Sequence, residues 1–150
     1  MKKIYLDICC FNRPYDNQKQ LRIKLESEAK LFIQSLIVNK KLELIWSFAL
    51  DFENSRNPYV AKQNAISDFA KHSNVFVFEN EEILKNAEII KQHNIKELDA
   101  LHIACAIYTK SDYFITTDDR ILKYNDSRIK IINPLDFIII YEKEGDEKCE

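Results

Sequence analysis

The sequence predicts an α/β protein, a three-layer α/β/α sandwich around a central, mainly parallel sheet. Short runs of β-forming apolar residues alternate with segments whose apolar residues recur at helical spacing. Strands that alternate with helices form βα units, and these units build a parallel sheet. The 150 residues are 46% hydrophobic and 31% charged, which is typical of a soluble globular protein. No run of about 18 apolar residues occurs, so no membrane span is expected.

The first half of the chain begins with a strand expected over residues 3–11. It is a run of β-formers with one carboxylate, Asp7, in its middle. Apolar residues fill both alternating sets, which indicates a strand buried on both faces, where an unpaired charge is costly. A helix with an apolar face is expected over 18–39. The elements that follow are a strand over 42–46, a helix over 48–55 with Ser47 as its N-cap, a helix ending near 71 and a strand over 74–78.

The second half continues the same alternation. The elements expected there are a helix over 81–93, a buried helix over 97–109, a strand over 113–116, a short helix ending at 124, a strand over 128–132 and a β-prone segment over 137–141. Residues 1–141 are predicted to form one domain. Residues 142–150, which carry five acids and two lysines, are predicted to be an acidic, flexible tail.

Composition excludes several classes of function. The only glycine is Gly145, so glycine-rich phosphate loops and nucleophile elbows are absent. A net charge of −2 argues against bulk electrostatic binding of nucleic acid, but a nuclease that holds metal needs an acidic site. The four cysteines have no metal-ligand spacing and are expected to be reduced thiols in the cytoplasm. Cys9 and Cys10 would point to opposite faces of the first strand.

Four acids follow or end elements that a parallel sheet would bring to one edge: Asp7, Glu53, Asp99 and Asp118. Carboxylates that converge in a low-dielectric cleft repel one another, so either some stay protonated or a divalent cation neutralises them. Oxygen ligands suit Mg²⁺ or Mn²⁺, and carboxylate-held metal is the usual tool of phosphoryl chemistry. Taken singly, Asp99 and Asp118 could equally be helix caps, and Glu53 a surface residue.

Several short motifs occur in a characteristic order: Tyr5-Leu6-Asp7 with Asn12-Arg13-Pro14, Ser47 followed by Glu53, Leu98-Asp99-Ala100-Leu101-His102-Ile103-Ala104, and Ile115-Thr116-Thr117-Asp118. This pattern resembles the PIN-domain family, and most closely its VapC-type toxin nucleases. The resemblance covers residues 4–137 and implies a metal-dependent endoribonuclease that prefers single strands. The family's acidic quartet falls on the same four acids. The chain departs from the family in the length between Glu53 and Asp99 and in its lack of glycine.

The resemblance also draws attention to neighbouring polar residues. Thr116 matches a polar residue that could position a metal-bound water. Asp119 is either a fifth acidic contributor or a helix cap. Arg13 would contact a substrate phosphate or form a loop-fixing ion pair. His102 lies one turn after Asp99 and would either orient that acid or hydrogen-bond inside the core. Asn12 and Ser47 are expected to support the acids through hydrogen bonds.

The sequence therefore predicts a cytoplasmic Mg²⁺- or Mn²⁺-dependent endoribonuclease. The resemblance implies the toxin of a type II toxin–antitoxin pair, with a small antitoxin that blocks the site and with a homodimer. Three alternatives remain: a catalytically inactive PIN-like scaffold or binding module, a non-toxin RNA-processing nuclease, and a phosphate-signalling receiver domain. A receiver needs paired acids near its start, where this chain offers only Asp7 before the first turn.

Overall fold

A five-stranded, all-parallel sheet forms the centre of the protein. The computed structural model describes the backbone of residues 1–149 and the side chains of residues 1–145. The strands are β1 (Lys2–Leu6), β2 (Leu42–Ser47), β3 (Val75–Val77), β4 (Tyr113–Ile115) and β5 (Lys130–Ile132), in the spatial order β3-β2-β1-β4-β5. The first strand of the chain is thus the middle strand of the sheet, with Tyr5 opposite Ile45 on one side and Phe114 on the other.

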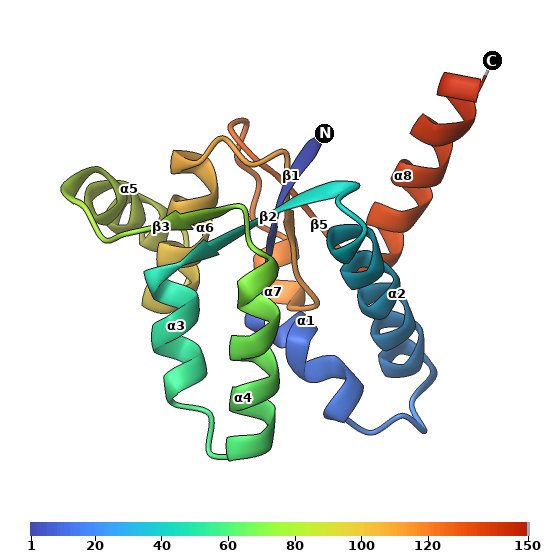
Figure 1. Cartoon of the computed structure of the whole chain (residues 1–150). Helices are drawn as coiled ribbons and strands as arrows, with labels where there is room; N and C mark the ends of the chain where they lie inside the picture. The colour runs from blue at the N-terminus through green and yellow to red at the C-terminus, as the bar shows by residue number, and fades with distance from the viewer. Residues whose placement is uncertain (150) are drawn as a thin grey trace.

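Helices cover both faces of the sheet, which confirms the predicted three-layer sandwich (Figure 1). The helices are α1 (Ile8–Asn12), α2 (Leu21–Val38), α3 (Phe48–Ser55), α4 (Val60–Phe69), α5 (Glu81–Lys91), α6 (Glu97–Tyr108), α7 (Asp119–Leu122) and α8 (Pro134–Cys149), with 3₁₀ turns η1 (Arg13–Tyr15) and η2 (Ala70–His72). Helices α2 and α8 pack together on one side of the sheet, and α5 packs with α6 on the other. Helix α3 contacts both α4 and α6.

The core is built on β1 because this strand has neighbours on both edges and helices over both faces. Ile4, Tyr5 and Leu6 are fully buried, as expected of a central parallel strand whose two residue sets are both apolar. Large side chains from the neighbouring elements fill the space on either side: Phe11, Trp46, Phe114 and Phe137. Among the described residues, no helix is long and apolar enough to span a membrane.

The first strand is shorter than the sequence predicts, and this changes the setting of Asp7. The strand ends at Leu6, and Asp7 is the N-cap of α1, with its Oδ1 accepting a hydrogen bond from the Ile8 amide at 2.8 Å. The predicted strand over 3–11 is therefore wrong beyond Leu6, because the carboxylate satisfies a free amide of a new helix at the sheet edge. Cys9 and Cys10 consequently lie on a helix and not on opposite faces of a strand.

The C-terminal segment is helical where a β-prone segment was expected. Residues 137–141 lie inside α8, which begins at Pro134 after Asn133, and the Asn133 Oδ1 accepts from the Leu135 amide at 2.8 Å. An Asn cap followed by proline in the first turn starts helices well, and burial of Phe137 outweighs the β propensity of its neighbours. Residues 142–149 continue this helix, so the predicted domain boundary after residue 141 falls within α8. The flexible tail stays a prediction, and residue 150 lies outside the described residues.

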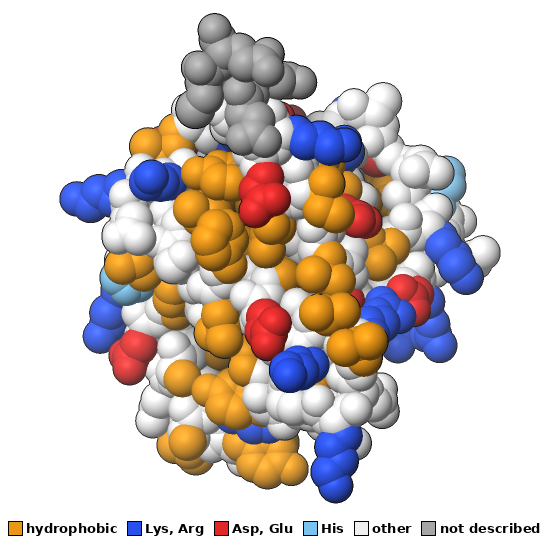
Figure 2. Space-filling view, turned by 90° about the vertical axis from the view of Figure 1, so that its right-hand side faces the viewer, with side chains coloured by type: hydrophobic (Ala, Val, Ile, Leu, Met, Phe, Trp, Pro, Cys, Tyr) orange, Lys and Arg blue, Asp and Glu red, His pale blue; other side chains and the backbone are white. Residues whose placement is uncertain are grey.

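One face of the molecule carries many exposed apolar side chains. Figure 2 views the protein from the side of α2 and α8, and apolar groups spread widely over this face. On α2, Leu21 is 70% exposed and Phe32 is 44% exposed, and on α8 Ile139 is 51% exposed. Contiguous apolar surface of this kind is typical of contact sites with other macromolecules.

Candidate active site

Asp7 is the most constrained acid in the protein. Its backbone amide donates to the carbonyl of Ile115 at 2.9 Å, which ties the end of β1 to β4. Its Oδ1 accepts from the Ile8 amide, and its Oδ2 accepts from the Thr116 hydroxyl at 2.9 Å. The side chain is buried, and no arginine or lysine among the described residues pairs with it. Asp7 is therefore a fixed carboxylate without a lysine or arginine partner in the part of the chain that the structure describes.

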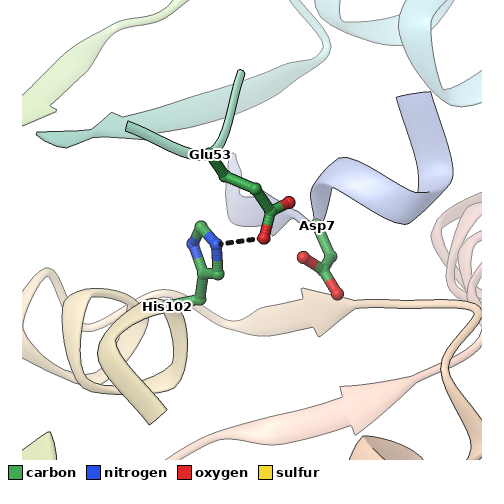
Figure 3. A group of neighbouring side chains, drawn as sticks. All are labelled: Asp7, Glu53 and His102. Atoms are coloured by element: carbon green, nitrogen blue, oxygen red, sulfur yellow. Dashed lines mark hydrogen bonds and ion pairs between the residues drawn. The ribbon is translucent and has the colours of Figure 1, made fainter. Parts of the chain in front are cut away.

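Glu53 and His102 complete a cluster with Asp7. Each of the three residues offers a ligand atom, and these atoms lie within 4.8 Å of one another (Figure 3). Glu53 comes from the second turn of α3, and His102 comes from the middle of α6. The Nε2 of His102 lies 3.3 Å from Oε1 of Glu53, and the histidine side chain is fully buried. The cluster thus joins the ends of β1 and α3 to the buried helix α6.

A hydrogen-bonded chain reaches the cluster from inside the core. The hydroxyl of Tyr5 lies 2.6 Å from Nδ1 of His102 and 2.7 Å from the hydroxyl of Ser47. Ser47 is also the N-cap of α3, where its Oγ accepts from the Leu50 amide at 3.1 Å. Both ring nitrogens of His102 therefore have partners, and the ring orientation toward Glu53 is fixed from behind.

Asp99 and Asp118 stand at the margin of this cluster. Asp99 is half-buried in the first turn of α6. Burial raises its pKa, and the charges of Asp118 and Glu53 add to the rise, while His102 opposes it. Asp118 caps α7 through an Oδ1 that accepts from the Arg120 amide at 2.9 Å. Asp118 thus performs the capping role that the sequence left open for it, while its charge still acts on Asp99.

Electrostatics at the cluster favour neutralisation of the acids. Burial raises the pKa of Asp7 well above its usual value, and the nearby Cys9, Glu53 and Asp99 raise it further. Burial lowers the pKa of His102, but the Glu53 hydrogen bond and the charges of Asp7 and Asp99 outweigh it, so the net shift is upward. Burial acts in opposite directions on the two groups, but the nearby negative charge raises the pKa of both.

These donors fit a divalent cation. Asp7 and Glu53 provide carboxylate oxygens, which suit Mg²⁺ and Mn²⁺, and the mutual repulsion of the acids is relieved by positive charge. His102 adds an imidazole nitrogen to the same space. Since that nitrogen already bonds Glu53, the carboxylates are the first candidates to hold metal, and His102 is the group that holds Glu53 in place.

Thr116 connects two of the acids. Its hydroxyl donates to Asp7 Oδ2 and accepts from the Asp118 amide at 3.1 Å. The hydroxyl proton is therefore committed to Asp7, so in this geometry Thr116 orients a carboxylate and does not point its proton at a water. Cys9 lies in the same corner, 3.3 Å from both Asp7 Oδ2 and the Thr116 hydroxyl. Cys9, Cys10 and Cys105 are free thiols, as expected, and the side chain of Cys149 lies outside the described residues.

Arg13 and Asp119 belong to a separate ion-pair network. Arg13 Nε lies 3.0 Å from Glu26 Oε1, and its NH1 lies 3.1 Å from Asp16. Asp119 receives two hydrogen bonds from Arg22, at 2.8 and 2.9 Å. Arg13 therefore has the loop-fixing role that the sequence left open. Asp119 is not the helix cap that the sequence allowed it to be, because Asp118 caps α7.

The two remaining supporting residues do not contact the acids directly. Ser47 bonds Tyr5 and Leu50 and acts on Glu53 only through Tyr5 and His102. Asn12 lines a cavity beside Glu53, and its Oδ1 is buried without a hydrogen-bond partner among the described residues. The sequence placed His102 near Asp99 but did not link it to Glu53. Its position three residues after Asp99 within the motif was the signal that could have suggested this role.

In open parallel α/β sheets ligands bind beyond the carboxyl ends of the strands, and carboxylates that gather at this edge suit a divalent cation. The model of the PIN domain family matches residues 4–127, and the chain belongs to that family.

Among solved structures, the fold is similar to a chain in the crystal structure of VapBC2 from Rickettsia felis bound to a DNA fragment from their promoter. The TM-score is 0.54 with 13% sequence identity, and the match covers 87% of this chain and 98% of the other. At this identity the likeness shows a shared fold. No curated protein matches the chain in sequence.

Proposed function

We propose that this protein is a metal-dependent endoribonuclease that hydrolyses RNA phosphodiester bonds. One observation supports it above all others: Asp7 and Glu53 approach each other at the sheet edge without a lysine or arginine partner among the described residues, and His102 holds Glu53 from behind. An uncompensated buried charge is costly, so its retention points to a cation that binds in function. Membership of the PIN domain family is consistent with this chemistry.

The proposed reaction is in-line attack of water on the phosphodiester, leaving a 5′-phosphate and a 3′-hydroxyl. When bound, Mg²⁺ or Mn²⁺ lowers the pKa of water, orients the phosphate and stabilises charge on the leaving oxygen. Asp7, Asp99 and Asp118 are proposed to hold the ion, and Glu53 to hold the ion or position the water. Thr116 keeps Asp7 in one orientation, and His102 does the same for Glu53.

We further propose that the nuclease is the toxin of a toxin–antitoxin pair and acts in the cytoplasm. The fold is shared with a chain of a VapBC2 complex, which supports a protein antitoxin as partner. The apolar face formed by α2 and α8 offers a surface for a protein contact, either with an antitoxin or in a homodimer. Light scattering on the purified protein, alone and with the product of an adjacent gene, tests both partners.

The deciding experiment is cleavage of a labelled single-stranded RNA with Mg²⁺, with Mn²⁺ and with EDTA. We expect cleavage that needs the metal and falls at least about 10³-fold in Asp7→Asn, because a group that holds charge in the transition state contributes on this scale. Glu88→Gln on α5 is the matched control, since this acid is exposed and does not belong to the cluster. Cleavage retained in Asp7→Asn would refute the assignment.

The inactive scaffold is the alternative that must be separated from an enzyme with a narrow RNA preference. Calorimetric titration with Mn²⁺ separates them, because a scaffold has no need to bind the ion. We expect binding by the unmodified protein and none by Asp7→Asn. Absence of both binding and cleavage would favour the scaffold.

A further inference from the structure

A cleft beside Glu53 is lined by groups that the acidic cluster does not use. Its volume is about 480 Å³, and its lining includes Ile8, Asn12, Glu53, Arg56, Tyr59 and Lys62. It lies between the end of α1, the end of α3 and the start of α4. Glu53 lines the cleft and also belongs to the acidic cluster, so the cleft adjoins the candidate metal site. The volume of the cleft suits a group the size of a nucleotide.

The cleft carries positive charge beside an acidic cluster. Lys62 and Arg56 make no ion pair within the part of the chain that the structure describes. Asp16 also lines the cleft, but its carboxylate is engaged by Arg13 at 3.1 Å. The cations next to Glu53 are therefore the ones left free for an anion, and a phosphate group has the matching charge.

Two exposed tyrosines flank the lysine. The ammonium of Lys62 lies 4.5 Å from the ring centre of Tyr59 and 4.9 Å from that of Tyr15. Tyr59 is 62% exposed and Tyr15 is 49% exposed, so both rings are open to stacking. Proteins that bind single-stranded nucleic acid combine cations that follow the backbone with aromatic rings on which bases stack.

Asn12 contributes an amide with an unmet hydrogen bond. Its Oδ1 is buried and has no partner among the described residues, although Asn12 lines the cleft. Buried polar atoms almost always have partners, so an orphan beside a cleft marks a side chain that gains its missing hydrogen bond by turning its amide toward a ligand. An amide both donates and accepts, which suits the edge of a nucleobase.

We propose that this cleft is a subsite for a nucleotide that flanks the scissile phosphate of single-stranded RNA. Lys62 and Arg56 contact a phosphate, Tyr59 stacks on a base, and Asn12 contacts a base edge, while Tyr15 lies outside the cleft lining on the far side of Lys62. The proposal rests on the proposed function, since it names how that site selects unpaired RNA.

The test measures binding of a fluorescent single-stranded RNA by Asp7→Asn, which keeps the bound strand intact. In that background we expect Tyr59→Leu to weaken binding about 5- to 100-fold, and Tyr59→Phe to restore most of it, because stacking needs the ring. Lys62→Gln should weaken binding and reduce the slope of log Kd against log salt concentration by about 0.7, the value for one lost phosphate contact. Tyr59→Leu should leave that slope unchanged.

Matched controls separate the cleft from general surface effects. Lys71→Gln and Tyr108→Leu remove an exposed lysine and an exposed tyrosine that do not line the cleft, and both should leave affinity and salt slope unchanged. Asn12→Ala should change the order of affinities among RNA homopolymers.

The outcomes separate this proposal from the nuclease assignment. RNA binding that depends on Tyr59 and Lys62 in a protein that cleaves no RNA would refute the nuclease and keep the subsite. Metal-dependent cleavage with RNA affinity and salt slope unchanged in both variants would refute the subsite and keep the nuclease. Loss of self-association in Tyr59→Leu, with RNA binding intact, would assign the cleft to a protein contact and refute the subsite.

Discussion

Two groups of acids adjoin the segment 116–119, and arginine neutralises only one of them. Asp119 and Glu26 are paired with Arg22, and Glu26 is also paired with Arg13. Asp7 and Glu53, by contrast, have a buried histidine and, among the described residues, no arginine. The two groups differ in role because a carboxylate with a permanent cation is a structural tie, whereas one without a cation is free to bind a metal ion.

The segment 116–119 contributes to both groups of acids. Thr116 donates to Asp7, which belongs to the group without arginine. Asp119, in the arginine-paired group, accepts hydrogen bonds from Arg22. Arg22 also donates to the carbonyl of Thr117 at 3.2 Å. The arginine therefore holds the loop that positions the Thr116 hydroxyl, so the paired acids support the unpaired ones.

Breaking the paired group should cost the most stability. Glu26 is fully buried and contacts Arg13, Arg22 and the side-chain amide of Asn133. We expect Glu26→Gln to lower the free energy of unfolding by about 2–4 kcal/mol, less than for a fully buried pair because both arginines reach solvent. Urea denaturation measures the change. A loss below about 1 kcal/mol would show that the network is not a structural tie.

Adding metal should stabilise the folded protein, and only when the acids without an arginine partner are intact. A ligand that binds only the folded state contributes about 1.4 kcal/mol at ten times its Kd and about 2.7 kcal/mol at one hundred times. We expect Mn²⁺ to raise the melting temperature of the unmodified protein and of Asp119→Asn, but not that of Asp7→Asn. An equal rise in all three would place the ion elsewhere.

Lys30 extends the comparison to a buried cation that pairs with no acid within the described part of the chain. It is 6% exposed, its ammonium lies 5.3 Å over the ring of Phe11, and burial lowers its pKa to about 8 from 10.5. Between pH 8 and 10.5 the unfolded state binds more protons than the folded state, so stability rises with pH in that window.

Replacement of this lysine should therefore stabilise the fold at neutral pH. We expect Lys30→Met to add about 1–3 kcal/mol at pH 7 and to abolish the rise between pH 8 and 10.5. Urea denaturation across this range measures both effects. A gain that does not shrink with rising pH would mean that packing, and not charge, is responsible.

The smallest effect is expected at Asp119, the exposed neighbour of Asp118. Its carboxylate contacts Arg22 at the surface, so Asp119→Asn should keep RNA cleavage within about threefold. Asp118→Asn should lose about 10- to 100-fold, because this carboxylate is proposed to hold the ion and its charge also acts on Asp99. Relative rates on one labelled RNA compare the two variants. Equal losses would place Asp119 within the acidic site.

The sequence predicted the sheet, the order of its strands along the chain and the acids that follow them, because apolar periodicity and strand ends are local signals. It did not show where β1 ends, since Ile8, Cys9 and Cys10 are β-formers that nonetheless follow the cap at Asp7. It also mistook part of α8 for a β-prone segment, because tertiary burial of Phe137 overrides propensity.

Contacts between residues that are distant in sequence were the main limit on predicting the site from the sequence. Glu53 and His102 are 49 residues apart, and Arg22 and Asp119 are 97 apart. Nothing local shows that one acid will meet a histidine and another an arginine. The contacts of Arg13 with Glu26 and of Asp119 with Arg22 are of this kind, and the expected supporting role of Asn12 stays a prediction.

The central position of β1 determines how late in synthesis the acidic cluster can form. Its two neighbours are β2 and β4, and the Asp7–Thr116 hydrogen bond spans 109 residues. Contacts of such long sequence separation form slowly, because loop closure must precede them. During synthesis, Asp7 emerges from the ribosome first but waits for β4, near residue 115, to complete its surroundings. A nascent chain therefore stays without an ordered acidic cluster until β4 and Thr116 have been made, and shorter chains lack the site.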